Sequence, residues 1–107
     1  MNRIQQARKA DKRTRYSGPK VFIGIDGLLA LAAAHPEFRG MHHIPAGDRH
    51  RAIVTRNGES IVGECTDQEA ATMAETSKVW KDHPVKMASV TAIRRAIEKA
   101  FPEFVPK

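Results

Sequence analysis

The dipeptide Asn57-Gly58 constrains the fold more than any other feature, because it lies between two segments with the composition of β-strands. Asn and Gly accept the positive φ angles of a type I′ turn, and this turn joins adjacent antiparallel strands. The flanking residues 51–56 and 59–65 contain the adjacent Ile and Val that favour extended backbone. The sequence therefore predicts a β-hairpin over residues 51–65, and with it an antiparallel sheet.

A strand and a helix are predicted before the hairpin. Residues 21–25 are β-branched or aromatic apart from one glycine, which is typical of a short buried strand. Asp26 is the predicted N-cap of a helix over residues 27–35, and Pro36 ends that helix. Capping is preferred over a catalytic role for Asp26, because no second carboxylate stands at a working spacing. Residues 41–44 are a candidate for a further short strand.

Two helices are predicted after the hairpin. Residues 66–69 have the pattern of a capping box, which predicts a short helix through about Glu75. Asp82 is the predicted N-cap of the last helix, which holds Pro84 in its first turn and ends at Pro102. Its expected core face consists of apolar residues at helical spacing: Val90, Ile93, Ile97, Ala100 and Phe101.

The resulting element order is β-α-β-β-α-α. It predicts an α+β fold in which a small antiparallel sheet with a β-hairpin packs against two or three helices. A chain of 107 residues has room for a single modest core. No apolar run approaches the roughly 20 residues of a membrane span, and the lone Cys65 excludes an internal disulfide. We therefore expect a protein of the reducing cytoplasm without membrane association.

Positive charge is concentrated at the N-terminus. Of the 18 Lys and Arg residues, seven lie in residues 1–20 with a single acid, whereas the remaining 11 basic and 11 acidic residues cancel. Residues 1–18 lack an apolar stripe, so we predict a flexible basic arm that is mobile or ordered only on binding. The boundary is predicted at Ser17-Gly18-Pro19, followed by one domain over residues 19–107.

Two interpretations of this arm remain open. A solvated tail without a ligand is one. The other is contact with nucleic-acid phosphates, since each neutralised phosphate releases condensed counterions. The residues expected to make such contacts are Arg8, Lys9, Lys12, Arg13, Arg15 and Lys20.

The histidines are the candidate metal ligands. His42, His43 and His50, with His83 and Cys65 elsewhere, offer ligands for zinc or for a ββα-metal nuclease. Structural zinc sites need four ligands at tight spacings, and the element after the first two histidines carries no second His or Asn at ligand spacing. We interpret them as surface or loop histidines, and expect no metal and no other cofactor.

Catalytic motifs are also missing from the sequence. Cys65 has no defined base partner, and Ser60 and Ser89 lie outside any triad context. Residues 24–27 match neither the Walker pattern nor the dinucleotide pattern. The sequence therefore predicts a protein that is not an enzyme. Trp80 beside Lys81 has two open interpretations, a stacking platform for a base next to a phosphate contact, or a core anchor.

Three segments between residues 20 and 104 can be compared with a known family. The first is residues 21–32 followed by His35, Phe38, Gly40 and Met41. The second is the predicted strand 52–56, which ends in an arginine. The third contains Val79, Trp80, Pro84, Met87, Ala92, Ala96 and residues 100–102. In this order they resemble the strand–helix, hairpin and closing-helix segments of RecT-type phage single-strand annealing proteins.

The resemblance implies a function without enzymatic chemistry. Such proteins bind single-stranded DNA in a basic groove, assemble into rings or filaments, and pair complementary strands without ATP. It implies single-stranded DNA as partner, self-association, and a phage exonuclease as a further partner in a bacterial host cell. The groove residues carried over by position are Arg56, Trp80, Lys81, Lys86, Arg94 and Arg95.

A second class of function also stays open. Family members are longer, the basic arm stands in place of the strands that precede this segment, and Ile25 replaces their arginine. A shortened core of this kind also suits a small phage protein inhibitor. Such a counter-defence protein, comparable to anti-CRISPR proteins, would bind a nucleic-acid-handling host complex.

Overall fold

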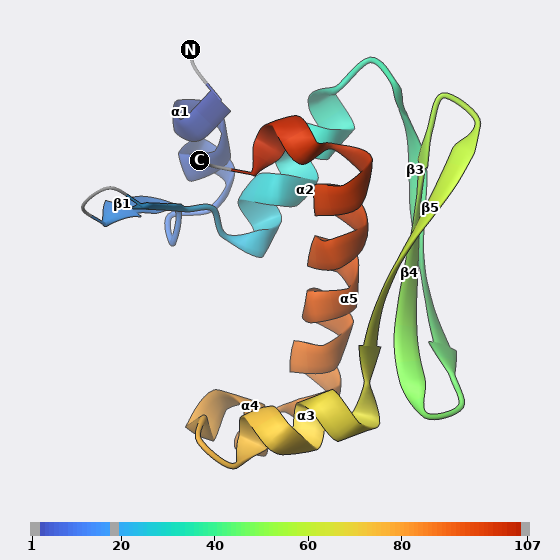
Figure 1. Cartoon of the computed structure of the whole chain (residues 1–107). Helices are drawn as coiled ribbons and strands as arrows, with labels where there is room; N and C mark the ends of the chain where they lie inside the picture. Colours follow the sequence, from blue (N-terminus) through green and yellow to red (C-terminus); the bar gives the residue numbers. More distant parts are fainter. Residues whose placement is uncertain (1–2, 18–19, 106–107) are drawn as a thin grey trace.

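The computed structural model describes residues 3–17 and 20–105, with the backbone alone described at residues 15–17, 20 and 21. The fold is α+β, and its antiparallel sheet with packed helices confirms the predicted class. The central sheet has the strand order β3 (Phe38–Ala46), β4 (Arg49–Arg56) and β5 (Glu59–Thr66). Helix α5 (Pro84–Ala100) packs along one face of this sheet (Figure 1).

A second layer lies on the side of α5 away from the sheet (Figure 1). It contains the helices α1 (Arg3–Ala10) and α2 (Ile25–Ala34) and a separate two-stranded hairpin of β1 (Arg15–Ser17) and β2 (Lys20–Phe22). The fully buried side chains of Leu28 on α2 and of Ile97 and Phe101 at the end of α5 belong to the core. Helix α5 is therefore the element that joins the two layers.

The remaining short helices lie at the two ends of α5. Helices α3 (Asp67–Ala74) and α4 (Lys78–Asp82) lie at its N-terminal end (Figure 1), and the 3-10 helix η1 (Pro102–Phe104) follows its C-terminal end. Compared with the predicted order, the structure adds α1, β1 and α4, and extends the short candidate strand into β3. No described helix is long and apolar enough to cross a membrane.

The predicted β-hairpin is confirmed. Asn57 and Gly58 both have positive φ angles, 48° and 89°, as a type I′ turn requires. The pairing continues from Arg56 opposite Glu59 to Arg49 opposite Thr66. The capping box after it is also confirmed, because Thr66 accepts a hydrogen bond from the Glu69 N–H and the Glu69 side chain accepts one from the Thr66 N–H.

The contact between α5 and β5 depends on small side chains. A Cβ atom at Gly63 would lie 2.3 Å from the Ala96 N and 2.4 Å from the Ala92 O. Ala92 and Ala96 are fully buried, and Ala88 is 2% exposed. The predicted core face is therefore incomplete: Ile97 belongs to it, but Val90 is only half-buried. A pattern of large apolar residues does not reveal the buried alanines of α5. Here the helix backbone lies close to β5, so small side chains fill the space between them.

The N-terminal segment differs from the predicted flexible arm. Residues 3–10 form α1, which packs against α2, and Ala7 is fully buried. A Cβ at Gly27 of α2 would lie 2.9 Å from the Ala7 O, so a glycine and an alanine allow the two helices to approach closely. One buried alanine gives no apolar stripe in the sequence. Residues 18 and 19 of the predicted boundary lie outside the described residues.

Helix α2 is capped by a residue distant in sequence, and the prediction of Asp26 as its N-cap is wrong. The N-cap residue is Gly24, which has no capping side chain. Asp11, whose side chain is 4% exposed, accepts a hydrogen bond from the Asp26 N–H at 3.1 Å. Thr14 Oγ1 accepts one from the Gly24 N–H at 3.0 Å. These two bonds satisfy N–H groups that the first turn leaves unpaired, and they fasten the N-terminal segment to the domain.

Two further local predictions need correction. The predicted buried strand over residues 21–25 is only partly formed: β2 ends at Phe22, which is exposed, and pairs with β1, and helix α2 begins at Ile25. Asp82 does not cap α5. It ends α4, and its carboxylate pairs with Lys78 at 3.1 Å. The chain then turns at His83, so Pro84 becomes the first residue of α5.

The close approach at Gly63 predicts a destabilised variant. Gly63→Ala places a methyl group against backbone atoms that cannot rotate away, so we expect a loss of about 1–3 kcal/mol in the free energy of unfolding. Ser60→Ala, at an exposed position on the same strand, is the matched control and should change stability by less than about 0.5 kcal/mol. Urea denaturation followed by circular dichroism measures both. Equal stability of the two variants would contradict the packing described here.

The Asp11 cap predicts a dependence of stability on pH. The hydrogen bonds from Arg13 lower the pKa of Asp11 from 3.8 to about 2. The folded carboxyl is therefore more acidic than the unfolded one, so its contribution is present above pH 3.8 and is lost as the pH falls toward about 2. We expect Asp11→Asn to cost about 1–2 kcal/mol at neutral pH, with the difference from the unmodified protein shrinking over this range.

Asp26→Asn is the control for this experiment, because the Asp26 side chain is 68% exposed and caps nothing. Urea denaturation at a series of pH values compares the three proteins. A stability difference for Asp11→Asn that stays constant from pH 7 down to the acid range would contradict the assignment of Asp11 as an ionised cap.

Candidate nucleic-acid interface

The predicted groove residue Arg56 is occupied by structural contacts. Its guanidinium lies 2.7 Å from the Glu37 carboxylate and 3.0 Å from the Glu103 carboxylate, and it donates to the Ala100 O at 2.7 Å. It also stacks over the Phe101 ring, with 4.6 Å between the guanidinium carbon and the ring centroid. These hydrogen bonds lower the pKa of both carboxyls. Arg56 therefore joins β4 to the end of α5. Its positive charge is compensated by the two carboxylates and is not available to bind a phosphate.

Arg94 and Arg95 on α5 have similar structural contacts. Arg94 donates to the Ile23 O at 2.8 Å and so ties α5 to the second layer. Arg95 pairs with the Glu69 carboxylate at 2.8 Å and donates to the Glu64 O at 2.7 Å. Three predicted groove arginines are therefore neutralised within the fold. The acidic partner of Arg94 is Glu98, 3.6 Å away and one turn later on α5, whereas Arg56 and Arg95 have partners from distant elements that no local pattern in the sequence shows.

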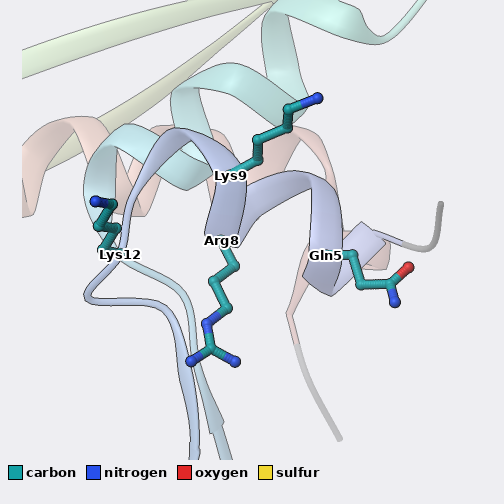
Figure 2. A pocket seen from close by; sticks show the side chains of 4 residues that line it. All are labelled: Gln5, Arg8, Lys9 and Lys12. Atoms are coloured by element: carbon teal, nitrogen blue, oxygen red, sulfur yellow. The ribbon is translucent and has the colours of Figure 1, made fainter.

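Three exposed cations without an acidic partner in the described residues lie close together on α1 and the turn after it. Arg8, Lys9 and Lys12 are exposed, and no described residue gives any of them an acidic partner. Together with Gln5 they line an open hollow of 680 Å³. Figure 2 shows that the three cationic side chains extend in different directions rather than toward one point. The hollow is therefore a basic surface and not a cradle for a single phosphate.

The other predicted arm residues contribute less to this surface. Arg13 pairs with the buried Asp11 carboxylate at 3.0 Å and lies 3.7 Å from Asp26, so its charge is compensated. The side chains of Arg15 and Lys20 lie outside the described residues, although their backbones form β1 and β2. The structure thus brings together three of the six predicted arm contacts.

Trp80 is a buried residue of α4 and is 9% exposed. It is part of the core, as one of the two interpretations predicts, and it also lines a cavity of 290 Å³ beside Lys81. Lys81 and Lys86 are exposed and have no acidic partner in the described part of the chain. Lys86 is absent from the cavity lining, which includes Pro84, Val85 and Ala88 of the same helix. The structure therefore does not bring Lys81 and Lys86 together at this cavity.

Two histidines meet on the helix-covered face of the sheet. His43 Nε2 lies 3.0 Å from His50 Nδ1, and the Ser89 Oγ of α5 lies 3.3 Å from the same nitrogen. His42 alternates to the opposite face, because it pairs with Ile53 while His43 pairs with Ala52. Within the described residues, no three His, Cys, Asp or Glu side chains are grouped so that they could hold a metal ion.

Cys65 is fully buried, and its burial raises the pKa of the thiol. A raised pKa disfavours the thiolate that nucleophilic chemistry needs. Sequence reasoning missed the contribution of His50 and Asp67 to the cavity beside Trp80. In the sequence, Asp67 directly follows the N-cap residue Thr66, and Trp80 lies in the next helical segment. This proximity along the chain is the only signal in the sequence that the two residues line one cavity. No protein-family model and no curated protein sequence matches the chain.

The contacts of Arg56 predict that this residue stabilises the fold and does not bind DNA. Arg56→Lys keeps the charge but loses the planar group that reaches two carboxylates and a carbonyl at once. We expect its melting temperature to fall by several degrees, whereas Lys86→Ala should leave it unchanged. Thermal unfolding followed by circular dichroism tests this. An Arg56→Lys variant as stable as the unmodified protein would show that the network is dispensable.

Proposed function

We propose that this protein binds single-stranded DNA without enzymatic chemistry, as a small protein of the single-strand annealing type. The observation that carries the proposal is the uncompensated cationic surface of Arg8 and Lys9 on α1 and Lys12 in the turn after it. Outside residues 1–20 the 11 basic and 11 acidic residues give no net charge, and Arg51, Arg56 and Arg95 are paired with acidic side chains. Binding energy for a polyanion is therefore concentrated at one end of the molecule.

The divergence of these side chains favours a chain of phosphates over a single one. Cations that converge bind one small anion, whereas cations spread over a helix surface contact successive phosphates of a flexible strand. Phosphate contacts alone leave the base edges free to test a complement. This is what strand pairing needs, and it agrees with the resemblance of residues 20–104 to RecT-type proteins. We further propose that the protein acts in the cytoplasm of a bacterial host cell, where its single buried thiol stays reduced.

The proposal predicts a strong dependence of binding on salt. For single strands each phosphate contact contributes about −0.7 to the slope of log K against log salt concentration. The double variant Arg8→Ala/Lys12→Ala should therefore bind a labelled single strand more weakly and reduce the slope by about 1.4. Fluorescence anisotropy over a salt series measures affinity and slope together.

The matched control is Arg39→Ala/Lys78→Ala, which removes two exposed charges from other elements. It should change the slope little, because neither residue lies on the α1 surface. Absence of binding at low salt, or identical slopes for both double variants, would overturn the proposal.

A further inference from the structure

The cavity beside Trp80 lies where four elements meet. Its lining consists of His50 from β4, alanines and Asp67 from α3, Trp80 and Lys81 from α4, and Pro84, Val85 and Ala88 from α5. Its volume of 290 Å³ is at the lower end of the range for small-molecule sites, which is about 300–1,000 Å³. Its walls are mostly apolar and include one large aromatic ring. Such a space suits a small planar ring better than an extended chain.

The hydrogen bonds of His50, a lining residue of the cavity, indicate which of its ring nitrogens is an acceptor. Ser89 donates its hydroxyl proton to the Val85 O at 2.8 Å, so its oxygen accepts from His50 Nδ1 at 3.3 Å. The same Nδ1–H faces His43 Nε2 at 3.0 Å. With Nδ1 carrying the proton, Nε2 of the neutral ring is left as an acceptor. The tautomer is assigned from these bonds, and it gives the cavity wall a lone pair.

Asp67 supplies a second acceptor at the same cavity. It is the first residue of α3, its backbone N–H donates to the Asp48 O at 2.8 Å, and its side chain is exposed. No cation among the described residues pairs with its carboxylate. Lys81 is the cavity's only cationic lining residue in the described part of the chain, and it is likewise unpaired.

We propose that this cavity, at the N-terminal end of α5, binds a nucleobase that carries an exocyclic amino group, supplied by a single strand that extends along the molecule from its contact with α1. The two hydrogens of one amino group match the two acceptors, His50 Nε2 and the Asp67 carboxylate. Trp80 provides the aromatic wall for the ring, and the Lys81 ammonium meets the adjacent phosphate. The inference rests on the proposed function, and it adds a base-selective site at the opposite end of α5 from the α1 surface, which contacts only the backbone.

Cytosine and uracil give a matched pair of probes, because uracil has a carbonyl where cytosine has the amino group. We expect a dC12 oligonucleotide to bind at least about fivefold more tightly than dU12, the lower end of what one well-placed base contact contributes. Trp80 is the single tryptophan of the chain, so its fluorescence should be quenched more strongly by dC12. Anisotropy and Trp fluorescence are measured on the same samples of the full chain.

Two variants test the cavity without disturbing the buried Trp80. Ala71→Leu fills it from an exposed position on α3, and Asp67→Asn replaces one acceptor by a group that also donates. Both should remove the preference for dC12 and leave the affinity for dU12 unchanged. Circular dichroism confirms that each variant is folded.

The outcomes separate this inference from the proposed function. Salt-dependent binding of both oligonucleotides with equal affinity and equal quenching would overturn the base site and leave the α1 contact intact. A dC12 preference that survives Ala71→Leu would also overturn it. If neither oligonucleotide binds, the proposed function fails, and cytidine monophosphate against uridine monophosphate then tests the cavity alone. Equal effects of the two nucleotides on Trp80 fluorescence would overturn the base site in that case too.

Discussion

The contact of α5 with β5 at Gly63 is the constraint on which the rest of the structure depends. No side chain fits between the glycine and the helix backbone at Ala92 and Ala96, so the helix lies directly on the strand. Because the helix lies directly on the strand, the side chains of Arg95 and Lys99 donate hydrogen bonds to the carbonyl oxygens of Glu64 and Val62. These bonds satisfy acceptors on the outer edge of β5 and leave that edge less available for pairing with another chain.

The same placement decides which cations remain available to a ligand. Arginine is suited to several planar contacts at once, and Arg56, Arg94 and Arg95 each bind a main-chain carbonyl as well as an acidic side chain. Arg8 and Lys9 on α1 and Lys12 in the turn after it have no such partners in the described residues. The fold thus uses the arginines around α5 for cohesion and leaves α1 to present charge. Because Asp11 caps α2, the segment that contains α1 is fixed against the domain and is not a flexible arm.

Sequence reasoning predicted the parts of the fold that local chemistry determines. Asn57-Gly58 specified its own turn, and Thr66 with Glu69 specified the start of α3, because each signal lies within four residues. The predicted N-cap of α2 is wrong for the opposite reason. Asp11 lies fifteen residues before the Asp26 N–H that it accepts from, so no local pattern identifies it as the capping residue.

The candidate site divides in the same way. Clustered charge in the sequence indicated Arg8, Lys9 and Lys12 correctly as exposed cations. It also indicated Arg95, whose partner Glu69 becomes a neighbour only when α3 folds against α5. The cavity at Trp80 is assembled from β4 and three helices, and no local pattern encodes it.

The most direct test of this account is a nuclear magnetic resonance titration with a dC12 oligonucleotide that follows arginine Nε–H and tryptophan indole signals. The account predicts salt-sensitive shifts for Arg8 and a shift for the Trp80 indole, while the Nε–H signals of Arg56, Arg94 and Arg95 stay in place. Large shifts of those three arginines with an unchanged Arg8 would contradict it, because the DNA would then displace the ion pairs that hold α5 in the fold.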